Sequence, residues 1–250
     1  DMGGPTFDAS IVDQGEGLIT HDYQLEWEIP IAIPMLDIRS VGAGGGSIAW
    51  VDKGNSLRVG PKSAGADPGP ACYNRGGVQP TVTDANLVLG YLDAENFLGG
   101  QARLDPVLSE MALKEHIAAP LGLSTVEAAH GVCRGVSTAM AEGVRLMSVQ
   151  RGVDPRRFAM VAFGGAAGLH ACQVARQLQI RKVHIPAAAP VLSAYGMLST
   201  DLKYDFSRSY PANLDGVDVA RLRTLMAEME AQGKEKLHAE GLSDEDIEVL

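Results

Sequence analysis

A long amphipathic helix is the feature that most constrains the fold of this chain. Apolar residues recur at steps of three and four from Ser124 to about Arg151, which predicts one continuous apolar stripe. Ser124 and Glu127 form a capping box at the start of this run, and Gly152 and Pro155 follow its end. A helix of this length extends roughly 40 Å. We therefore expect it to span a domain and to carry other elements on its apolar face.

The segments on either side of this helix predict an α/β fold. Short runs of β-forming residues separated by glycine, proline and asparagine indicate strands, and amphipathic runs indicate further helices. The expected strands are Ser10–Val12, Gln24–Ile29, Asp37–Arg39, Ser47–Val51, Leu57–Val59, Phe158–Phe163 and Lys182–Ile185. The expected helices are Thr83–Gly90, His170–Gln179, Val191–Ser199 and Val217–Glu240.

Composition restricts the partners of the chain. Its 250 residues are 46% apolar and 21% charged, which is typical of a folded globular protein. A net charge of −10 argues against nucleic acid or an anionic membrane as the main partner, and no apolar run is long enough to cross a bilayer. Three scattered cysteines form neither a zinc motif nor a disulfide framework, and this low, odd count predicts a cytoplasmic location.

Both ends of the sequence suggest a piece of a longer polypeptide. The chain starts without methionine and opens at Asp1 directly on a functional-looking turn, with no strand before it to hold that turn. It ends on a strand-like run, Asp244–Leu250. We therefore expect the fold to be incomplete at both ends.

The opening segment, Asp1–Asp8, combines two acids, two glycines and a hydroxyl residue in one tight turn. Glycines let main-chain N–H groups approach a phosphate closely, and a turn of such groups forms an anion-binding nest. The acids repel a bare phosphate, but they suit a Mg²⁺ ion bound between them and the phosphate. The pattern predicts a nucleotide-phosphate and metal site. An ordinary Gly-Gly hairpin with solvated acids is an equally open interpretation.

A second glycine corner, Gly164–Gly168, lies between the strand Phe158–Phe163 and the next helix. A helix N-terminus attracts anions or polar ligand edges, and glycines there let a base or a ribose lie against the main chain. A tight turn that needs glycine only for packing is the alternative. The corner lacks both GxGxxG and a downstream acid, which argues against a Rossmann dinucleotide site. We interpret His170 as a residue that caps the helix.

A third glycine cluster contains Gly42, Gly44, Gly45 and Gly46. Fixing each of these glycines costs roughly 0.5–1 kcal/mol relative to alanine. A fold that keeps these glycines despite the cost is expected to need a close approach of the main chain to a neighbouring group here. The approach is either to a ligand, which we favour, or to another segment of the chain.

The loop Gly65–Tyr73 alternates proline and glycine and is expected to be stiff. Such a loop either holds Asp67 or Cys72 at a cleft or simply covers the surface. Cys133 lies on the apolar stripe of the long helix, and we interpret it as a core residue. Cys172 is interpreted in the same way.

Long ordered motifs make the chain resemble the hydantoinase A and 5-oxoprolinase family over residues 1 to about 210. They are DMGGPTFD at 1–8, IRSVGAGGGSIAWVD at 38–52, LRVGPKSAGADPGPACYNRGG at 57–77, PTVTDANLVLGYLD at 80–93, SVQRGVDPRRFAMVAFGGAAGLHA at 148–171 and VLSAYGMLSTDLKYDFSR at 191–208. Such motifs are far more specific than a single glycine turn. Subunits of acetone and acetophenone carboxylases resemble the same family.

This resemblance implies an RNase H-like fold of the actin, sugar kinase and heat-shock ATPase type, with a mixed sheet flanked by helices. ATP would bind between two such domains. Residues 1–210 would be the second half of this ATPase core, and residues 211–250 the truncated start of a helix–strand region. DMGGPTFD would be the second phosphate loop and FGGAAG at 163–168 the adenosine motif, while the first phosphate loop would lie upstream.

The resemblance also implies roles for single residues. Asp1 and Asp8 would orient Mg²⁺, directly or through water. The residues expected to bind ATP are Gly3, Gly4, Thr6, Gly44, Gly45, Gly46, Gly164, Gly165 and Ala166.

The implied activity is ATP-dependent hydrolysis of a cyclic amide, such as a hydantoin, 5-oxoproline or a related lactam, together with a hydantoinase B-type partner subunit. A subunit of an ATP-dependent ketone carboxylase is the first alternative, because the activation of bicarbonate would be shared. A non-catalytic assembly module with a decayed ATP site is the second. Pro5 keeps it open because it replaces a hydroxyl residue and removes a main-chain donor, and Ala167 does so because it replaces a glycine.

Overall fold

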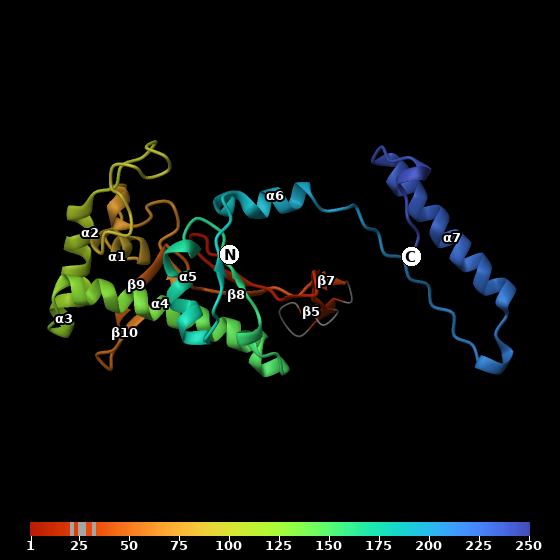
Figure 1. Ribbon diagram of the computed structural model, residues 1–250, viewed down its shortest axis with the longest axis horizontal. Coiled ribbons are helices and arrows are strands. Elements are labelled where there is room, and N and C mark those ends of the chain that lie inside the picture. The colour runs from red at the N-terminus through yellow and green to blue at the C-terminus, as the bar shows by residue number, and fades with distance from the viewer. Residues whose placement is uncertain (21–22, 25–28, 32–33) are drawn as a thin grey trace. The chain divides into compact units, whose positions relative to one another are not determined.

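The computed structural model describes residues 1–20, 23–24, 29–31 and 34–250. The chain divides into two compact units, Asp1–Ala194 and Tyr195–Leu250, and each is described by itself. This division comes earlier in the chain than the domain boundary expected at residue 210. Figure 1 labels the α-helices of both units and some of the strands of the first.

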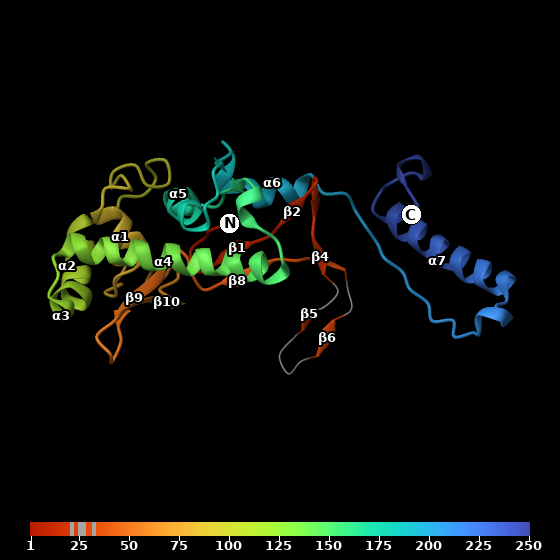
Figure 2. The ribbon, with the colours of Figure 1, turned by 60° about the horizontal axis from the view of Figure 1, so that its bottom comes forward.

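Helix α4, Thr125–Met147, is the longest element of the first unit (Figures 1 and 2). The Ser124 hydroxyl accepts a hydrogen bond from Glu127 N, and the Glu127 carboxylate accepts one from Ser124 N at 2.9 Å. The predicted capping box and helix are therefore confirmed. The α-helix ends at Met147 with Ser148 as its C-cap, and the last residues of the predicted run form a 3₁₀ turn, Val149–Arg151.

The apolar stripe of α4 lies at the centre of the main hydrophobic core. Val132, Val136 and Met140 expose at most 1% of their surface. Two helices pack directly on this stripe, α1 (Val82–Val88) and α5 (Ala167–Leu178). Helix α2 (Pro106–Leu113) continues through a π-helical turn (Lys114–Ala118) into α3 (Ala119–Leu121). Helix α6 (Leu192–Leu198) contains the boundary between the two units.

The described strands form six two-stranded pairs. The antiparallel pairs are β1 (Phe7–Ala9) with β8 (Arg39–Val41), β2 (Val12–Asp13) with β3 (Glu16–Gly17), β4 (Ile19–Thr20) with β7 (Met35–Leu36), β5 (Tyr23–Gln24) with β6 (Pro30–Ile31), and β9 (Ser47–Val51) with β10 (Leu57–Ser63). The parallel pair is β11 (Met160–Val161) with β12 (Val183–His184). The arrangement is α/β, but in the described part the strands form separate pairs where a single mixed sheet was expected.

Several predicted elements differ from the observed ones at their ends. The strand Ser47–Val51 is confirmed, whereas the strand expected over Phe158–Phe163 is paired only at Met160–Val161, opposite β12. Helix α5 begins at Ala167, so His170 lies inside the helix and not at its cap. The strand expected over 24–29 lies mainly outside the described residues.

One buried carboxylate, that of Asp84, anchors the loop before α1. It accepts hydrogen bonds from the N–H groups of Ala71, Cys72 and Thr81 and from the hydroxyls of Thr81 and Ser109, at distances of 2.7 to 3.2 Å. These donors offset the desolvation of a charged group in the core. Cys72 is thereby held in the core, fully buried, and does not reach a cleft.

The second unit contains α7, Val219–Ala239, so the predicted C-terminal helix is confirmed. Asp218 caps its N-terminus. Lys236 Nζ lies 5.2 Å from the ring centre of Tyr204 and 5.3 Å from that of Phe206. The segment that precedes α7 therefore packs back on this helix through cation–π contacts.

Candidate functional site

The opening segment folds as a tight hairpin. Asp1 N donates to the Asp8 carbonyl at 2.8 Å, and Asp8 N donates to the Asp1 carbonyl at 2.9 Å. Gly3 N donates to the Thr6 carbonyl at 3.0 Å and closes the turn. Among the described residues, the N–H groups of Gly4 and Thr6 have no hydrogen-bond acceptor. Two main-chain donors are therefore available to an anion at the tip.

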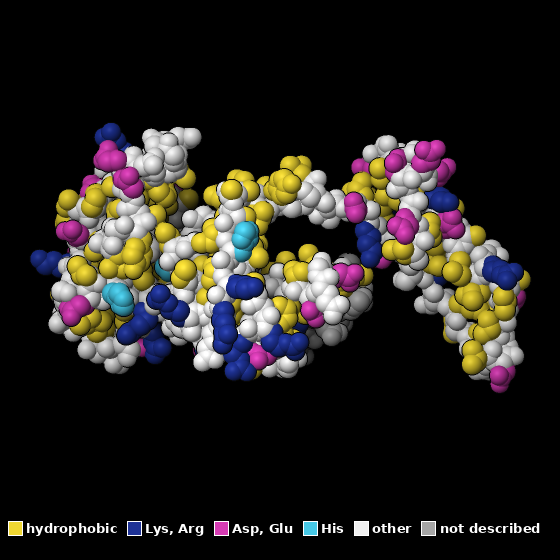
Figure 3. Space-filling model, in the orientation of Figure 1, with side chains coloured by type: hydrophobic (Ala, Val, Ile, Leu, Met, Phe, Trp, Pro, Cys, Tyr) yellow, Lys and Arg dark blue, Asp and Glu magenta, His cyan; other side chains and the backbone are white. Residues whose placement is uncertain are grey.

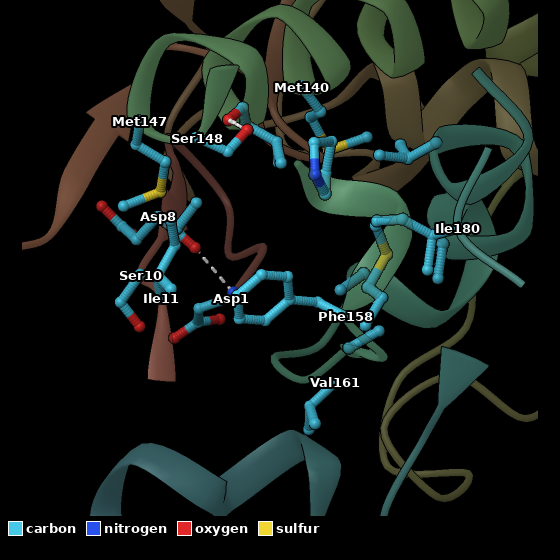
Figure 4. Close-up of a pocket in the computed structure, with 18 of the residues that line it drawn as sticks. Asp1, Asp8, Ser10, Ile11, Met140, Met147, Ser148, Phe158, Val161 and Ile180 are labelled. Atoms are coloured by element: carbon cyan, nitrogen blue, oxygen red, sulfur yellow. Dashed lines mark hydrogen bonds between the residues drawn. The ribbon is translucent and has the colours of Figure 1, made fainter. Parts of the chain in front are cut away.

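The hairpin places two carboxylates on one face. Asp1 and Asp8 are directly opposite each other in the ladder, so their side chains project to the same side (Figure 4). Asp8 accepts hydrogen bonds from the Thr6 hydroxyl, at 3.1 Å, and from the Ser40 hydroxyl. Asp1 accepts one from the Ser193 hydroxyl at 3.0 Å. These hydroxyls orient both acids.

This donor set fits Mg²⁺. That ion is usually held by one or two carboxylates, with phosphate and water oxygens completing its octahedron, and Asp1 and Asp8 supply the two carboxylates beside free main-chain donors. In the described part of the chain, no cluster of three or more His, Cys, Asp or Glu side chains could hold a metal. Ligands from phosphate and water would therefore be needed to complete the coordination.

The second glycine corner contacts the hairpin directly. Met2 N donates to the Phe163 carbonyl at 3.0 Å, and Ala166 N donates to the Met2 carbonyl at 3.1 Å. A Cβ atom on Gly164, whose φ is +90°, would overlap the Asp1 carboxylate and the Met2 main chain. The structure thus brings the two predicted corners side by side, and glycine is required at position 164 for this approach.

The exposed side of this corner offers further main-chain donors. Gly165 is exposed, and its N–H has no acceptor among the described residues. Helix α5 follows at once, and Ala166, at its N-cap, has no side chain that accepts a hydrogen bond from the first turn. The N–H of Ala166 donates to the Met2 carbonyl, so the available donor of this corner is the N–H of the exposed Gly165.

The third glycine cluster supports the hairpin from the other side. Gly45 N donates to the Gly3 carbonyl at 3.0 Å, and Gly46 N donates to the Gly4 carbonyl at 2.8 Å. A Cβ atom on Gly44 would overlap the Gly4 carbonyl. The close approach expected here is therefore to another segment of the chain. The N–H groups of Gly45 and Gly46 hold the hairpin, so they do not make the direct ligand contact that we favoured from the sequence.

Pro5 and Ala167 are the two residues that kept the interpretation of a decayed ATP site open, and the main-chain geometry accommodates both. Pro5 lies at the exposed tip of the hairpin, where the closing hydrogen bond does not need its missing N–H. Ala167 is the first residue of α5 and is not left-handed. The left-handed residue of that corner is Gly164.

With this geometry in place, comparison with known proteins identifies the chain. The profile described as Hydantoinase/oxoprolinase matches residues 1–206. The chain belongs to the Hydantoinase/oxoprolinase family. It is 42% identical to the caprolactamase subunit alpha of Pseudomonas jessenii over 243 residues, covering 96% of this chain and 35% of that subunit. It is 38% identical to the 5-oxoprolinase PfmaA of Pestalotiopsis fici over 248 residues, covering 92% of this chain and 19% of that protein.

Solved structures in this family also match. A nucleotide-free structure of acetone carboxylase, described as ATP-dependent, superposes with a TM-score of 0.86 at 32% identity. The match covers 98% of this chain and 36% of that one. The chain therefore spans about a third of the length of the caprolactamase subunit and of the acetone carboxylase chain.

His170, predicted as a cap, is instead the centre of a buried polar network. Its Nε2 accepts a hydrogen bond from Asn86 Nδ2 at 3.1 Å, and its Nδ1 lies 3.4 Å from the Ser137 hydroxyl. Burial lowers the pKa of His170 to about 4, so the ring is neutral at pH 7, with the proton on Nδ1. Cys133 donates to the Asn86 carbonyl oxygen at 3.2 Å, and burial raises its pKa to about 12. Sequence analysis missed Asn86, because its partner lies on a distant helix.

Two other candidates lie outside the site. Cys172 is exposed, so its interpretation as a core residue was wrong; it falls on the outer side of α5. Asp67 is exposed in its loop, and no hydrogen bond joins its side chain to another described residue.

The acidic chain carries a local basic surface on the face drawn in Figure 3. Figure 3 shows Lys and Arg side chains gathered over the C-terminal ends of α4 and α5. Three of the arginines in this region form ion pairs, Arg145 with Glu142, Arg151 with the buried Asp37, and Arg156 with Asp154. Much of the local charge is therefore neutralised within the chain. In the described part of the chain, no helix is long and apolar enough to cross a membrane.

Proposed function

We propose that this chain is the nucleotide-binding part of an enzyme that hydrolyses cyclic amides at the expense of ATP. The observation that carries the proposal is the hairpin with the Asp1 and Asp8 carboxylates on one face and free N–H groups at its tip. Anions bind where main-chain N–H groups converge, and the start of α5 adds a partial positive charge next to them. The family supports ATP as the nucleotide.

Each part of the site has a role in this proposal. Asp1 and Asp8 hold Mg²⁺, directly or through water, and the N–H groups of Gly4 and Thr6 donate to phosphate oxygens. Gly3, whose N–H closes the turn on the Thr6 carbonyl, lets the phosphate approach the main chain closely. The corner Gly164, Gly165 and Ala166 lies against the adenosine. When bound, Mg²⁺ neutralises the charge of the phosphoryl group that is transferred. The N–H groups of Gly45 and Gly46 fix the carbonyls of Gly3 and Gly4, and Gly44 allows the close approach to Gly4 that this pairing needs.

The unit Asp1–Ala194 represents, in this proposal, the second half of an RNase H-like ATPase core. A helix-flanked α/β unit with a phosphate hairpin and a glycine corner side by side is consistent with that fold. The substrate would be a lactam or a related ring, because amides are poor electrophiles and need activation by phosphoryl transfer before water opens the ring. Relatives named as a caprolactamase and a 5-oxoprolinase support this class.

We further propose a partner of the hydantoinase B type and a cytoplasmic location. The caprolactamase relative is named as a subunit, which supports an assembly with a second polypeptide. The location rests on the three cysteines, which are all free thiols.

An ATP-dependent ketone carboxylase is a second candidate. It is favoured by the TM-score of 0.86 with acetone carboxylase. The nucleotide site would be shared, and the difference would lie in the partner and in the carbon substrate.

The test is calorimetric titration of the complete polypeptide that contains this chain with Mg-ATP, followed by assays of ATP cleavage with its partner subunit. Caprolactam, hydantoin, 5-oxoproline and acetone are the substrates to compare. Cleavage stimulated by a cyclic amide supports the first candidate, and stimulation by acetone alone supports the second. No binding of Mg-ATP contradicts both and favours a non-catalytic assembly module.

A further inference from the structure

Two helices, α1 and α5, begin beside the hairpin. The Met2 carbonyl accepts from Ala166 N, at the N-cap of α5, at 3.1 Å. The next carbonyl, that of Gly3, accepts from Gly45 N, and the Gly45 carbonyl accepts in turn from Thr83 in the first turn of α1. A Cβ atom on Gly45 would lie 3.1 Å from the Thr83 hydroxyl and 3.8 Å from Ala166 Cβ. The starts of the two helices therefore meet at this point of the hairpin.

One helical turn further along, the same two helices meet again inside the core. Asn86 comes one turn after Thr83, and His170 comes one turn after Ala166, so each lies on the same face of its helix as the earlier residue. Asn86 Nδ2 donates to His170 Nε2 at 3.1 Å, and both residues expose only 1% of their surface. Among the described residues, this is the only hydrogen bond that joins α1 to α5.

Two connections fix the relative orientation of α1 and α5, whereas a single one would let the helices turn about it. Both helices pack on α4 through apolar side chains (Figure 2), and apolar contacts have no directional preference. A hydrogen bond, in contrast, weakens steeply when its angle departs from linearity. The Asn86–His170 bond therefore fixes how α5 lies relative to α1, and with it the glycine corner that leads into α5.

Two side chains of α4 hold the pair in this orientation. The Ser137 hydroxyl lies 3.4 Å from His170 Nδ1, and the Cys133 thiol donates to Asn86 Oδ1 at 3.2 Å. The polar atoms are therefore satisfied together in one arrangement of the three helices. A pair of aliphatic side chains could fill the same space with little loss of stability, so the role that we assign to the polar pair is orientation.

We propose that Asn86 and His170 are positioning residues of the nucleotide site, which keep the glycine corner aligned with the hairpin. This inference rests on the proposed function, in which the hairpin receives the phosphates and the corner Gly164–Ala166 lies against the adenosine. The hairpin is also held through Gly45 and Thr83, independently of the pair. Loss of the pair therefore displaces the adenosine side of the site and leaves the phosphate side in place.

Substitutions in the complete polypeptide that contains this chain test the assignment. His170→Leu and Asn86→Leu each remove the hydrogen bond, and the double variant removes both polar groups together. His170→Gln is the matched control, because glutamine keeps an acceptor for Asn86. Ile117→Val removes a fully buried methylene group elsewhere in the core, so it controls for a loss of stability alone.

The first measurement is calorimetric titration with Mg-ATP and, separately, with inorganic tripolyphosphate and Mg²⁺, which lacks the adenosine. The three leucine variants are expected to bind Mg-ATP about tenfold more weakly than the unsubstituted protein and tripolyphosphate within about twofold. The double variant should lose no more affinity than either single one, because all three lack the same bond. The two controls should keep both affinities. Equal losses for the two ligands, or an unchanged affinity for Mg-ATP, overturn the proposal.

The second measurement is amide hydrogen exchange without nucleotide. The Ala166 amide, bound to the Met2 carbonyl, is expected to exchange about tenfold faster in the leucine variants and at an unchanged rate in His170→Gln. The amide of Asp105, which donates to the Cys72 carbonyl at 2.9 Å, serves as an internal reference. Unchanged protection of Ala166 in the leucine variants overturns the proposal. If the unsubstituted protein does not bind Mg-ATP, the proposed function fails, and this exchange measurement alone decides whether the pair positions the corner.

Discussion

The main chains of Asp1 and Asp8 hydrogen-bond to each other in both directions, at 2.8 and 2.9 Å. This pairing sets two carboxylates next to each other at the base of a hairpin whose tip has free donors. The proposed metal site is therefore built by local main-chain geometry, and it does not depend on a distant loop closing over it.

Replacement of the Asp8 carboxylate is expected to weaken Mg-ATP binding. In the complete polypeptide, Asp8→Asn removes one of the two charges that attract the ion but keeps the size of the side chain, so affinity should fall at least tenfold, or about 1.4 kcal/mol. Calorimetric titration measures this loss. Asp13→Asn is the matched control, because Asp13 is exposed on the next strand pair and its loss should leave affinity unchanged. Equal affinities for both variants would rule out a role for Asp8 in binding the metal.

Position 164 is expected to accept only glycine. Gly164→Ala places a Cβ atom against Asp1 and Met2 and forces a left-handed conformation on alanine, so we expect a loss of about 1–3 kcal/mol of unfolding free energy. Urea unfolding measures it. Gly165→Ala is the control, since a Cβ atom there meets open space. Similar stabilities of the two variants would contradict the close contact of the corner with the hairpin.

The buried carboxylate of Asp84 is expected to be essential for the loop before α1. In Asp84→Asn, an NH₂ group replaces an acceptor that faces main-chain and hydroxyl donors. We expect a loss of about 2–4 kcal/mol, detected by denaturant unfolding and by faster exchange of the Cys72 amide. Asp67→Asn, on the exposed part of the loop, should change stability by less than about 0.5 kcal/mol. A mild effect at position 84 would mean that the network is not intact in solution.

The buried His170 is expected to make the chain less stable in mild acid. Its folded pKa of about 4 lies below the ordinary value of 6.5, so between these values the unfolded chain binds a proton that the folded chain excludes. Stability should therefore fall as pH decreases through this window, by about 2 kcal/mol between pH 7 and pH 5. Urea unfolding at both pH values gives the difference.

His170→Gln should remove most of this pH dependence, because glutamine keeps an acceptor for Asn86 and does not titrate. His184→Gln is the control at an exposed ring and should retain the full dependence. If the two variants respond to pH alike, His170 is not the group responsible.

The local elements could be predicted well from the sequence. Helix α4 carries its own capping box and a complete apolar stripe, and the strand Ser47–Val51 is defined by neighbouring turns. These features depend on residues close together in the chain. The two glycine corners could also be recognised, because glycine clusters have few other physical explanations.

Contacts between distant segments could not be predicted in the same way. The glycine cluster around Gly44 predicts that the main chain lies close to a neighbouring group, but only the structure shows that this group is the carbonyl of Gly4. Likewise, Asn86 and His170 come together only because α1 and α5 both pack on α4. Cys172 was misplaced because a helix that is apolar on one side still exposes single residues on the other.

The support of the hairpin by the third glycine cluster has a mechanical consequence. The carbonyl of Gly45 accepts hydrogen bonds from both the N–H and the hydroxyl of Thr83, each at 2.8 Å, and Thr83 lies in the first turn of α1. The tip of the hairpin is thus tethered to a helix whose next residue, Asp84, anchors the proline-rich loop. A ligand that displaces the tip also displaces this helix and the loop. Binding at the hairpin is therefore coupled to the position of the proline-rich loop.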